Sequence, residues 1–199
     1  MKSNTNVTRG SGLLEGLLAK KRSAKANSLI KDFHRKGRIL DIGCGSYPYF
    51  LMTVDFKEKY GVDPVLDMSK IKNGKVILKK LDVTEQKLPF ADNNFDVITM
   101  LAVFEHIDEN KLKFILSEIK RVLKKEGILI ITTPAPWSDR VLHFMARVGL
   151  ISKEEMEEHK HNYDSKAIRN ILVESGFKKE KIKKGFFEIY MNMWLAAVK

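Results

Sequence analysis

The residues best suited to chemistry lie around a glycine turn that follows a short apolar stretch. The segment Asp41-Ile42-Gly43-Cys44-Gly45 places two glycines one residue apart. Glycine has no Cβ, so its backbone adopts positive φ and lies directly against a ligand. A strand, such a turn and a helix N-terminus leave N–H groups unpaired, which favours a polar or negatively charged ligand. Nucleotide-type cofactors bind there, outside the carboxyl ends of parallel strands.

Two further positions narrow the kind of cofactor. A dinucleotide fingerprint has a third glycine at the sixth position, which is Pro48 in this chain. Twenty residues beyond Gly43, a second apolar stretch ends in Asp63-Pro64. A single carboxylate at that place accepts hydrogen bonds from both hydroxyls of a ribose. The pattern therefore favours a cofactor that contains a ribose and argues against a nicotinamide-dependent oxidoreductase.

Successive motifs along the chain resemble those of the class I S-adenosylmethionine-dependent methyltransferases, in their small-molecule, quinone-type (methyltransferase type 11-like) branch. The resemblance covers roughly residues 36–199, and the family's usual third glycine is Tyr47 here. It implies an α/β fold: a Rossmann-like, doubly wound, seven-stranded, mostly parallel sheet with a C-terminal antiparallel hairpin. The motifs that carry it are residues 41–45, 61–63, 81–83, 95–98, 103–106 and 118–129.

The resemblance also implies the cofactor S-adenosyl-L-methionine, the product S-adenosyl-L-homocysteine, and a set of residues that bind them. Asp63 would hold the ribose hydroxyls, and Asp82 would accept a hydrogen bond from the adenine amine, unless it only caps its own turn. Cys44 is expected to be a small filler rather than a nucleophile. The expected cofactor-binding residues are Asp41, Gly43, Cys44, Gly45, Asp63, Pro64, Asp82, Val83 and Leu101.

Within that set, the two ends of the cofactor are assigned to different residues. The glycine turn would lie against the methionine part, and Asp41 and the carbonyl of Leu101 would face its ammonium group. The backbone N–H of Val83 would contact a ring nitrogen of adenine.

His106 is the candidate catalytic residue. It follows the fourth expected strand, and imidazole accepts a proton near neutral pH. A histidine that caps or packs against the next helix is an equally good interpretation, and Glu105 is expected to point into the scaffold. Some quinone-type relatives carry a metal-binding glutamate where this chain has Ala102, so no metal is expected.

Residues 134–163 interrupt the regular alternation of strands and helices and are interpreted as a lid over the substrate. Trp137, His161 and Tyr163 are the candidate acceptor-binding residues in this segment. His159 and His161 lie two residues apart, but no convincing third ligand accompanies them, so zinc is not expected.

The remaining pattern divides the chain into two parts. Residues 1–35 are expected to have a disordered start (1–11) followed by one or two amphipathic helices, and residues 36–199 are expected to form a methyltransferase domain. The N-terminal helix would either lie across the cofactor mouth or only pack on the sheet. Strands are expected at about 38–42, 59–63, 75–81, 95–101, 127–133, 181–188 and 191–198, and the clearest helices at 109–125 and 165–175.

The net charge of +11 is concentrated at the two ends of the chain. Residues 1–38 hold ten basic and two acidic residues, whereas residues 39–175 are nearly balanced. Such ends suit nucleic acid or an anionic membrane surface, but solvated surface is the favoured interpretation. No apolar run is long enough to span a bilayer, no signal peptide is recognised, and one cysteine forms no internal disulfide. A cytoplasmic protein is expected.

The leading hypothesis is methyl transfer to a small-molecule acceptor, at an oxygen atom. An RNA or protein methyltransferase that uses the basic termini is the alternative, as is a non-catalytic cofactor-binding module. Many base-methylating enzymes carry an Asn/Asp-Pro-Pro-Tyr/Phe element after the fourth strand, where this chain has Leu101-Ala102-Val103-Phe104. Nucleic acid is therefore not favoured, and the sequence leaves the acceptor and the oligomeric state open.

Overall fold

The computed structural model describes residues 14–67, 76–150 and 163–199, and the expected disordered start and His161 lie outside these ranges. The sheet strands are β1 Arg38–Ile42, β2 Glu58–Asp63, β3 Ile77–Lys80, β4 Phe95–Leu101, β5 Leu123–Pro134, β6 Ile182–Phe187 and β7 Asn192–Val198. The α-helices are α1 Glu15–Leu29, α2 Asp32–Arg35, α3 Tyr49–Thr53, α4 Glu109–Val122, α5 Asp139–Arg147 and α7 Ser165–Glu174. Three short 3₁₀ helices are η2 Phe104–His106, η3 Pro136–Ser138 and η4 Lys179–Lys181.

The strands form a seven-stranded sheet in the order β3-β2-β1-β4-β5-β7-β6. The first five of these positions are parallel to one another, and β7 runs antiparallel to both β5 and β6. This arrangement confirms the predicted doubly wound α/β sheet and its C-terminal antiparallel hairpin. The order reverses between β1 and β4, which is where ligands bind in open sheets of this kind.

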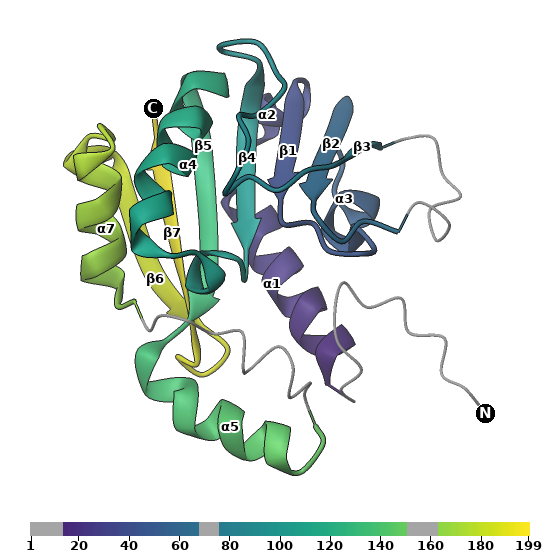
Figure 1. Ribbon diagram of the computed structural model, residues 1–199, viewed down its shortest axis with the longest axis vertical. Coiled ribbons are helices and arrows are strands. Elements are labelled where there is room, and N and C mark those ends of the chain that lie inside the picture. Colours follow the sequence, from purple (N-terminus) through teal and green to yellow (C-terminus); the bar gives the residue numbers. More distant parts are fainter. Residues whose placement is uncertain (1–13, 68–75, 151–162) are drawn as a thin grey trace.

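Helices cover both faces of the sheet because its central strands are apolar on both sides. On one face α4 and α7 bury a large apolar cluster against the sheet, and on the other α1 and α3 bury a second (Figure 1). Strand β1 is buried over its last four residues, and only the first and last parts of β4 retain any exposure. These two strands therefore end inside the molecule, and their carboxyl ends face the candidate site.

The boundary between α4 and β5 differs from the prediction of a helix over 109–125. The helix ends at Val122, and Leu123 already belongs to β5. β5 then bulges at Glu126, which has a positive φ of 62° and lies in the register shift between the pairs Phe95–Leu123 and Val97–Ile128. Gly127 is needed for space, because a Cβ there would lie 2.9 Å from both Leu123 and the carbonyl oxygen of Lys124.

The N-terminal helix α1 and the helix α5 meet beyond the carboxyl ends of the strands (Figure 1). Leu14 and Leu18 pack around Leu142 of α5, and the N–H of Leu14 donates to the carbonyl of Leu150 over 2.9 Å. Together the two helices form part of the wall over the end of the sheet. Across the described ranges, no helix has the length and apolarity that crossing a membrane requires.

Candidate functional site

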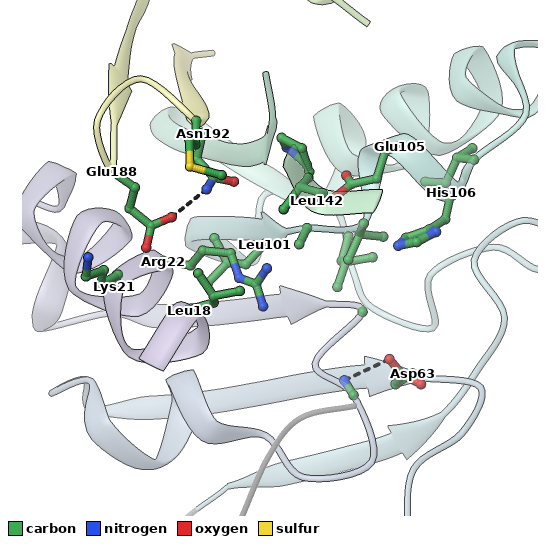
Figure 2. Close-up of a pocket in the computed structure, with 18 of the residues that line it drawn as sticks. Leu18, Lys21, Arg22, Asp63, Leu101, Glu105, His106, Leu142, Glu188 and Asn192 are labelled. Carbon is green, nitrogen blue, oxygen red and sulfur yellow. Dashed lines mark hydrogen bonds between the residues drawn. The ribbon is translucent and has the colours of Figure 1, made fainter. Parts of the chain in front are cut away.

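A cavity of about 390 Å³ lies at the carboxyl ends of the parallel strands. The loops after β1, β2 and β4 form its floor, and α1, α5 and the β6–β7 loop form its other walls (Figure 2). One part of its wall is polar and includes Asp63 and Asp82. Another part is mostly apolar and includes Leu142, Met145 and Met191. The cavity is thus large enough for a cofactor and offers two chemically different surroundings.

The glycine turn after β1 adopts the predicted conformation. Gly43 and Gly45 have φ values of 75° and 76°, in the left-handed region that favours glycine. The N–H of Gly43 donates to the carbonyl of Val62 over 2.8 Å, which ties the turn to β2. A Cβ on Gly43 would overlap with the side chain of Val103. The turn therefore brings bare backbone to the cavity wall between β1 and β4.

Asp63 ends β2 and lies on the cavity wall with only 1% of its surface exposed. Its Oδ2 accepts from the N–H of Gly45 and its Oδ1 accepts from the N–H of Val65, both over 2.8 Å. Each carboxylate oxygen has two lone pairs, so these backbone bonds orient the group without using its full accepting capacity. Figure 2 shows the bond that links Asp63 to the glycine turn.

The other residues expected at the adenosine end also line the cavity. Pro64, Asp82 and Val83 follow β2 and β3. Leu101, which is expected at the ammonium group instead, ends β4 and lines the cavity too. Asp82 Oδ1 accepts from both the N–H and the hydroxyl of Thr84, over 2.9 and 2.7 Å. Asp82 therefore does cap its own turn, as one interpretation of the sequence has it, and it still lies on the wall. Thr84 lines the cavity as well, a contact that the sequence analysis missed.

Asp41 does not reach the main cavity. It lines a small adjoining cavity of about 30 Å³ together with Arg22, Gly43 and Cys44. The register pairs Asp41 with Thr99 on β4, and the Thr99 hydroxyl donates to Asp41 Oδ1 over 2.6 Å. Burial raises the pKa of the Asp41 carboxyl to about 7, and the nearby charge of Asp63 adds to this effect. A cation bound beside the glycine turn would favour the ionised form.

The raised pKa of Asp41 has a consequence for stability. The proton is bound more tightly in the folded protein than in the unfolded chain, so stability present below pH 3.8 is lost as the pH rises through about 7. We expect the free energy of unfolding of the wild-type protein to fall relative to that of Asp41→Asn between about pH 5 and pH 8. Urea titrations at several pH values measure this difference. Parallel curves for the two proteins would contradict it.

His106 lines the cavity from η2, directly after Glu105. Glu105 is 3% exposed and also lines the cavity, although the sequence analysis expects it to point into the scaffold. Neither oxygen of its carboxylate has a hydrogen-bond partner in the part of the chain that the structure describes. In the view of Figure 2 the Glu105 carboxylate is turned toward Leu142. The only feature of the sequence that could have indicated Glu105 as a cavity residue is its place beside His106.

The structure places two of the candidate acceptor-binding residues off the cavity wall. Trp137 is 53% exposed on η3, and Tyr163 packs edge-on against the ring of Phe104, with the ring centroids 5.4 Å apart. Neither lies among the residues that line the cavity. His161 lies outside the described residues. From the described part of residues 134–163, Pro134, Leu142 and Met145 line the cavity.

Charged residues from two other elements line the cavity and were missed from the sequence. Lys21 and Arg22 belong to α1, for which the sequence analysis left open whether it lies across the cofactor mouth or only packs on the sheet, and named no residue of the site. Glu188 belongs to the β6–β7 loop, and its Oε2 accepts from the amide of Asn192. Burial raises the pKa of the Glu188 carboxyl, and the charges of Arg22 and Lys21 oppose that rise. Within the described ranges, no group of three or more metal-ligating side chains occurs.

The central part of the chain matches a known protein family. Residues 40–131 match the family model described as "Methyltransferase domain". Two uncharacterised proteins of Methanocaldococcus jannaschii are similar in sequence. One is 37% identical over 105 residues, which are 52% of this chain and 44% of that protein. The other is 28% identical over 157 residues, 70% of this chain and 61% of that protein. The chain thus matches less than two thirds of the length of either relative.

Solved structures share the fold over nearly the whole chain. An S-adenosylmethionine-dependent methyltransferase from Archaeoglobus fulgidus has a TM-score of 0.72 at 22% identity, covering 94% of this chain and 98% of that one. A chain from the complex of Haloferax volcanii Trm112 methyltransferase activator with a putative methyltransferase has a TM-score of 0.70 at 14% identity, covering 92% of each. A possible histamine N-methyltransferase from Thermotoga maritima has a TM-score of 0.67 at 18% identity, covering 92% and 91%. At these identities the likeness concerns the fold.

Proposed function

We propose that this chain, whose residues 40–131 match a methyltransferase domain, is a class I S-adenosylmethionine-dependent enzyme that transfers a methyl group to an oxygen atom of a small-molecule acceptor. The observation that supports this most is the cavity at the carboxyl ends of the strands, with Asp63 on one part of its wall and apolar side chains on another. The family's cofactor supplies a methyl group on a positively charged sulfonium. The protein binds the cofactor and the acceptor, aligns them and excludes water.

The residues present fit that cofactor. Gly43 and Gly45 line the cavity without side chains, so their backbone would lie against the ligand. Asp63 presents an oriented carboxylate to the ribose hydroxyls. Asp41 has a raised pKa that a neighbouring cation would lower, as the methionine ammonium would. Asp82 and Val83 would hold the adenine, and the carbonyl of Leu101 would face the ammonium.

Arg22 is the residue that we assign to the methionine carboxylate. It lines both the main cavity and the small cavity that holds Asp41 and Gly43. A guanidinium donates paired hydrogen bonds to a carboxylate, each stronger than a neutral one. We expect Arg22→Gln to weaken the binding of S-adenosylhomocysteine about tenfold or more, as measured by calorimetry. The exposed Lys20→Gln is the matched control, and equal affinities of the two variants would contradict the assignment.

The acceptor would occupy the apolar part of the cavity. Its walls are formed by Leu142 and Met145 of α5 and by Met191, which directly precedes β7. We propose that residues 134–163 act as the lid over it, supported by the Leu14–Leu150 hydrogen bond that joins α1 to the end of this helix. His106 is the candidate proton acceptor for the hydroxyl. Alignment alone contributes up to about 7–11 kcal/mol, so an acidic acceptor needs little help from a base.

The other functional hypothesis is a macromolecular acceptor, RNA or protein. It is supported by the basic N-terminal segment and by the similar Haloferax volcanii protein, which was solved with a methyltransferase activator. The apolar part of the cavity wall favours a small molecule instead. RNA retention that falls steeply with salt concentration would favour the macromolecular hypothesis. For either acceptor we propose a cytoplasmic setting, because a single cysteine gives the chain no internal disulfide that would need an oxidising compartment.

The proposed function is tested by incubating the protein with S-adenosylmethionine labelled in the methyl group and a fractionated cell extract. We expect the label to appear in a small molecule, on oxygen, in amounts that depend on the protein. Label on RNA or protein would favour the alternative. Binding of the cofactor without any labelled product would identify a non-catalytic module.

A further inference from the structure

Glu105 is buried on the cavity wall without a partner. Its side chain belongs to η2, it is 3% exposed, and neither carboxylate oxygen accepts a hydrogen bond from the described residues. A buried polar group left unpaired costs free energy, and a carboxylate costs more than a neutral group. A residue kept only for the scaffold would be paired or apolar. Glu105 therefore has the properties of a group whose partner is a ligand.

The position of Glu105 assigns it to the acceptor part of the cavity. The adenosine end lies over β2 and β3, where Asp63 and Asp82 are. Glu105 lies on the other side of β4, because η2 follows β4 and packs against β5. Figure 2 shows its carboxylate turned toward Leu142 of the lid helix and away from Asp63. The methionine ammonium has its own candidates, Asp41 and Leu101, on the side of β1.

The cations on the cavity wall act on Glu188, so a partner for Glu105 would have to come from a ligand. The cations of Lys21 and Arg22 act on Glu188, which also accepts a hydrogen bond from Asn192. No ion pair to Glu105 exists among the described residues. The nearby wall is formed by apolar side chains such as Leu142 and Met145. A ligand that pairs with Glu105 must therefore bring a donor, and preferably a positive charge, on an apolar body.

We propose that the acceptor carries a protonated amine and that Glu105 binds this amine. This rests on the proposed function, since it describes the molecule that occupies the acceptor part of the same cavity. A protonated amine has no lone pair, so the methyl group goes to another atom of the acceptor, in agreement with transfer to oxygen. Glu105 thus determines specificity: it selects aminated phenols or alcohols over their neutral and acidic counterparts.

The test measures the binding of matched phenols to the full chain saturated with S-adenosylhomocysteine. Tyramine, 4-ethylphenol and 3-(4-hydroxyphenyl)propionate share the ring and hydroxyl but carry an amine, no charge and a carboxylate. The same set with a meta hydroxyl tests a second shape. We expect at least one amine to bind about tenfold or more tightly than its neutral counterpart, and the acid to bind least.

Glu105→Gln separates recognition from a structural role. We expect it to reduce the preference for the amine to less than about twofold, to leave S-adenosylhomocysteine affinity unchanged, and to raise the melting temperature of the ligand-free protein. Glu109→Gln, an exposed change of the same charge on α4, is the matched control and should keep the preference. A lowered melting temperature with an unchanged preference would show a structural role instead.

Three results would overturn the proposal. The first is equal affinity for the amine and neutral members of both sets, including no measurable binding of any. The second is an amine preference that persists in Glu105→Gln. The third is a loss of S-adenosylhomocysteine affinity in Glu105→Gln, which would assign the carboxylate to the cofactor. If the wild-type protein itself does not bind S-adenosylhomocysteine, the proposed function fails and this inference fails with it.

Discussion

Replacing Asp63 with alanine is expected to weaken binding of S-adenosylhomocysteine at least about 100-fold while the protein stays folded. Under the proposed function, the variant would lose the acceptor for both ribose hydroxyls. It also removes the acceptor of the N–H groups of Gly45 and Val65, so the glycine turn loses the bond that holds it against β2. Two functions of one carboxylate, binding the ligand and positioning the turn, are lost together. Calorimetry measures the affinity, and circular dichroism checks the fold.

Two further variants separate these effects. Asp63→Asn keeps one acceptor oxygen and should retain part of the affinity. Asp55→Ala changes an exposed aspartate outside the cavity and should leave affinity unchanged. Undiminished affinity in a folded Asp63→Ala protein would refute the role of Asp63 in holding the ribose.

Gly43→Ala is expected to be the most damaging single-methyl change at the site. The left-handed backbone at φ 75° costs about 1–2 kcal/mol for a residue with a Cβ, and overlap with Val103 adds about 1–3 kcal/mol. We expect the free energy of unfolding to fall by about 2–5 kcal/mol, and cofactor binding to weaken because relief of the overlap with Val103 displaces the turn that lines the cavity. Urea denaturation measures the first effect and calorimetry the second.

The double variant Gly43→Ala/Val103→Ala tests the cause. It removes both γ-methyl groups of Val103, the nearest atoms to the added Cβ, and should recover the part of the stability lost to overlap. The part lost to backbone strain should remain. A double variant no more stable than Gly43→Ala would show that the overlap does not contribute to the loss of stability.

Most of the fold was predictable because its signals are local. Apolar stretches that end in Asp41 and Asp63 mark β1 and β2 within a residue, and the apolar stripe between Glu109 and Val122 marks α4. The end of α4 was predicted three residues too late. Lys124 and Lys125 suit a helix C-terminus as well as a strand start, and only pairing of Leu123 with Phe95 of β4 decides between them.

That Gly43, Asp63 and Asp82 line the cavity was predictable for the same reason, since they lie at or just after the ends of strands. The opposite part of the cavity wall was not predictable. Glu105 differs from a scaffold glutamate only in lacking partners, and Arg22 reaches the cavity only because α1 packs over the end of the sheet. Trp137 and Tyr163 were chosen from residues 134–163 by residue type, but Trp137 is exposed on η3 and Tyr163 packs against Phe104. Such contacts depend on tertiary packing, which local patterns do not contain.

A crystal structure of the protein with S-adenosylhomocysteine tests the central claim most directly. The account predicts the ligand across the Gly43–Gly45 turn, with both ribose hydroxyls within hydrogen-bond distance of Asp63 and the adenine beside Asp82 and Val83. A ligand bound elsewhere, or a ribose that makes no contact with Asp63, would contradict it.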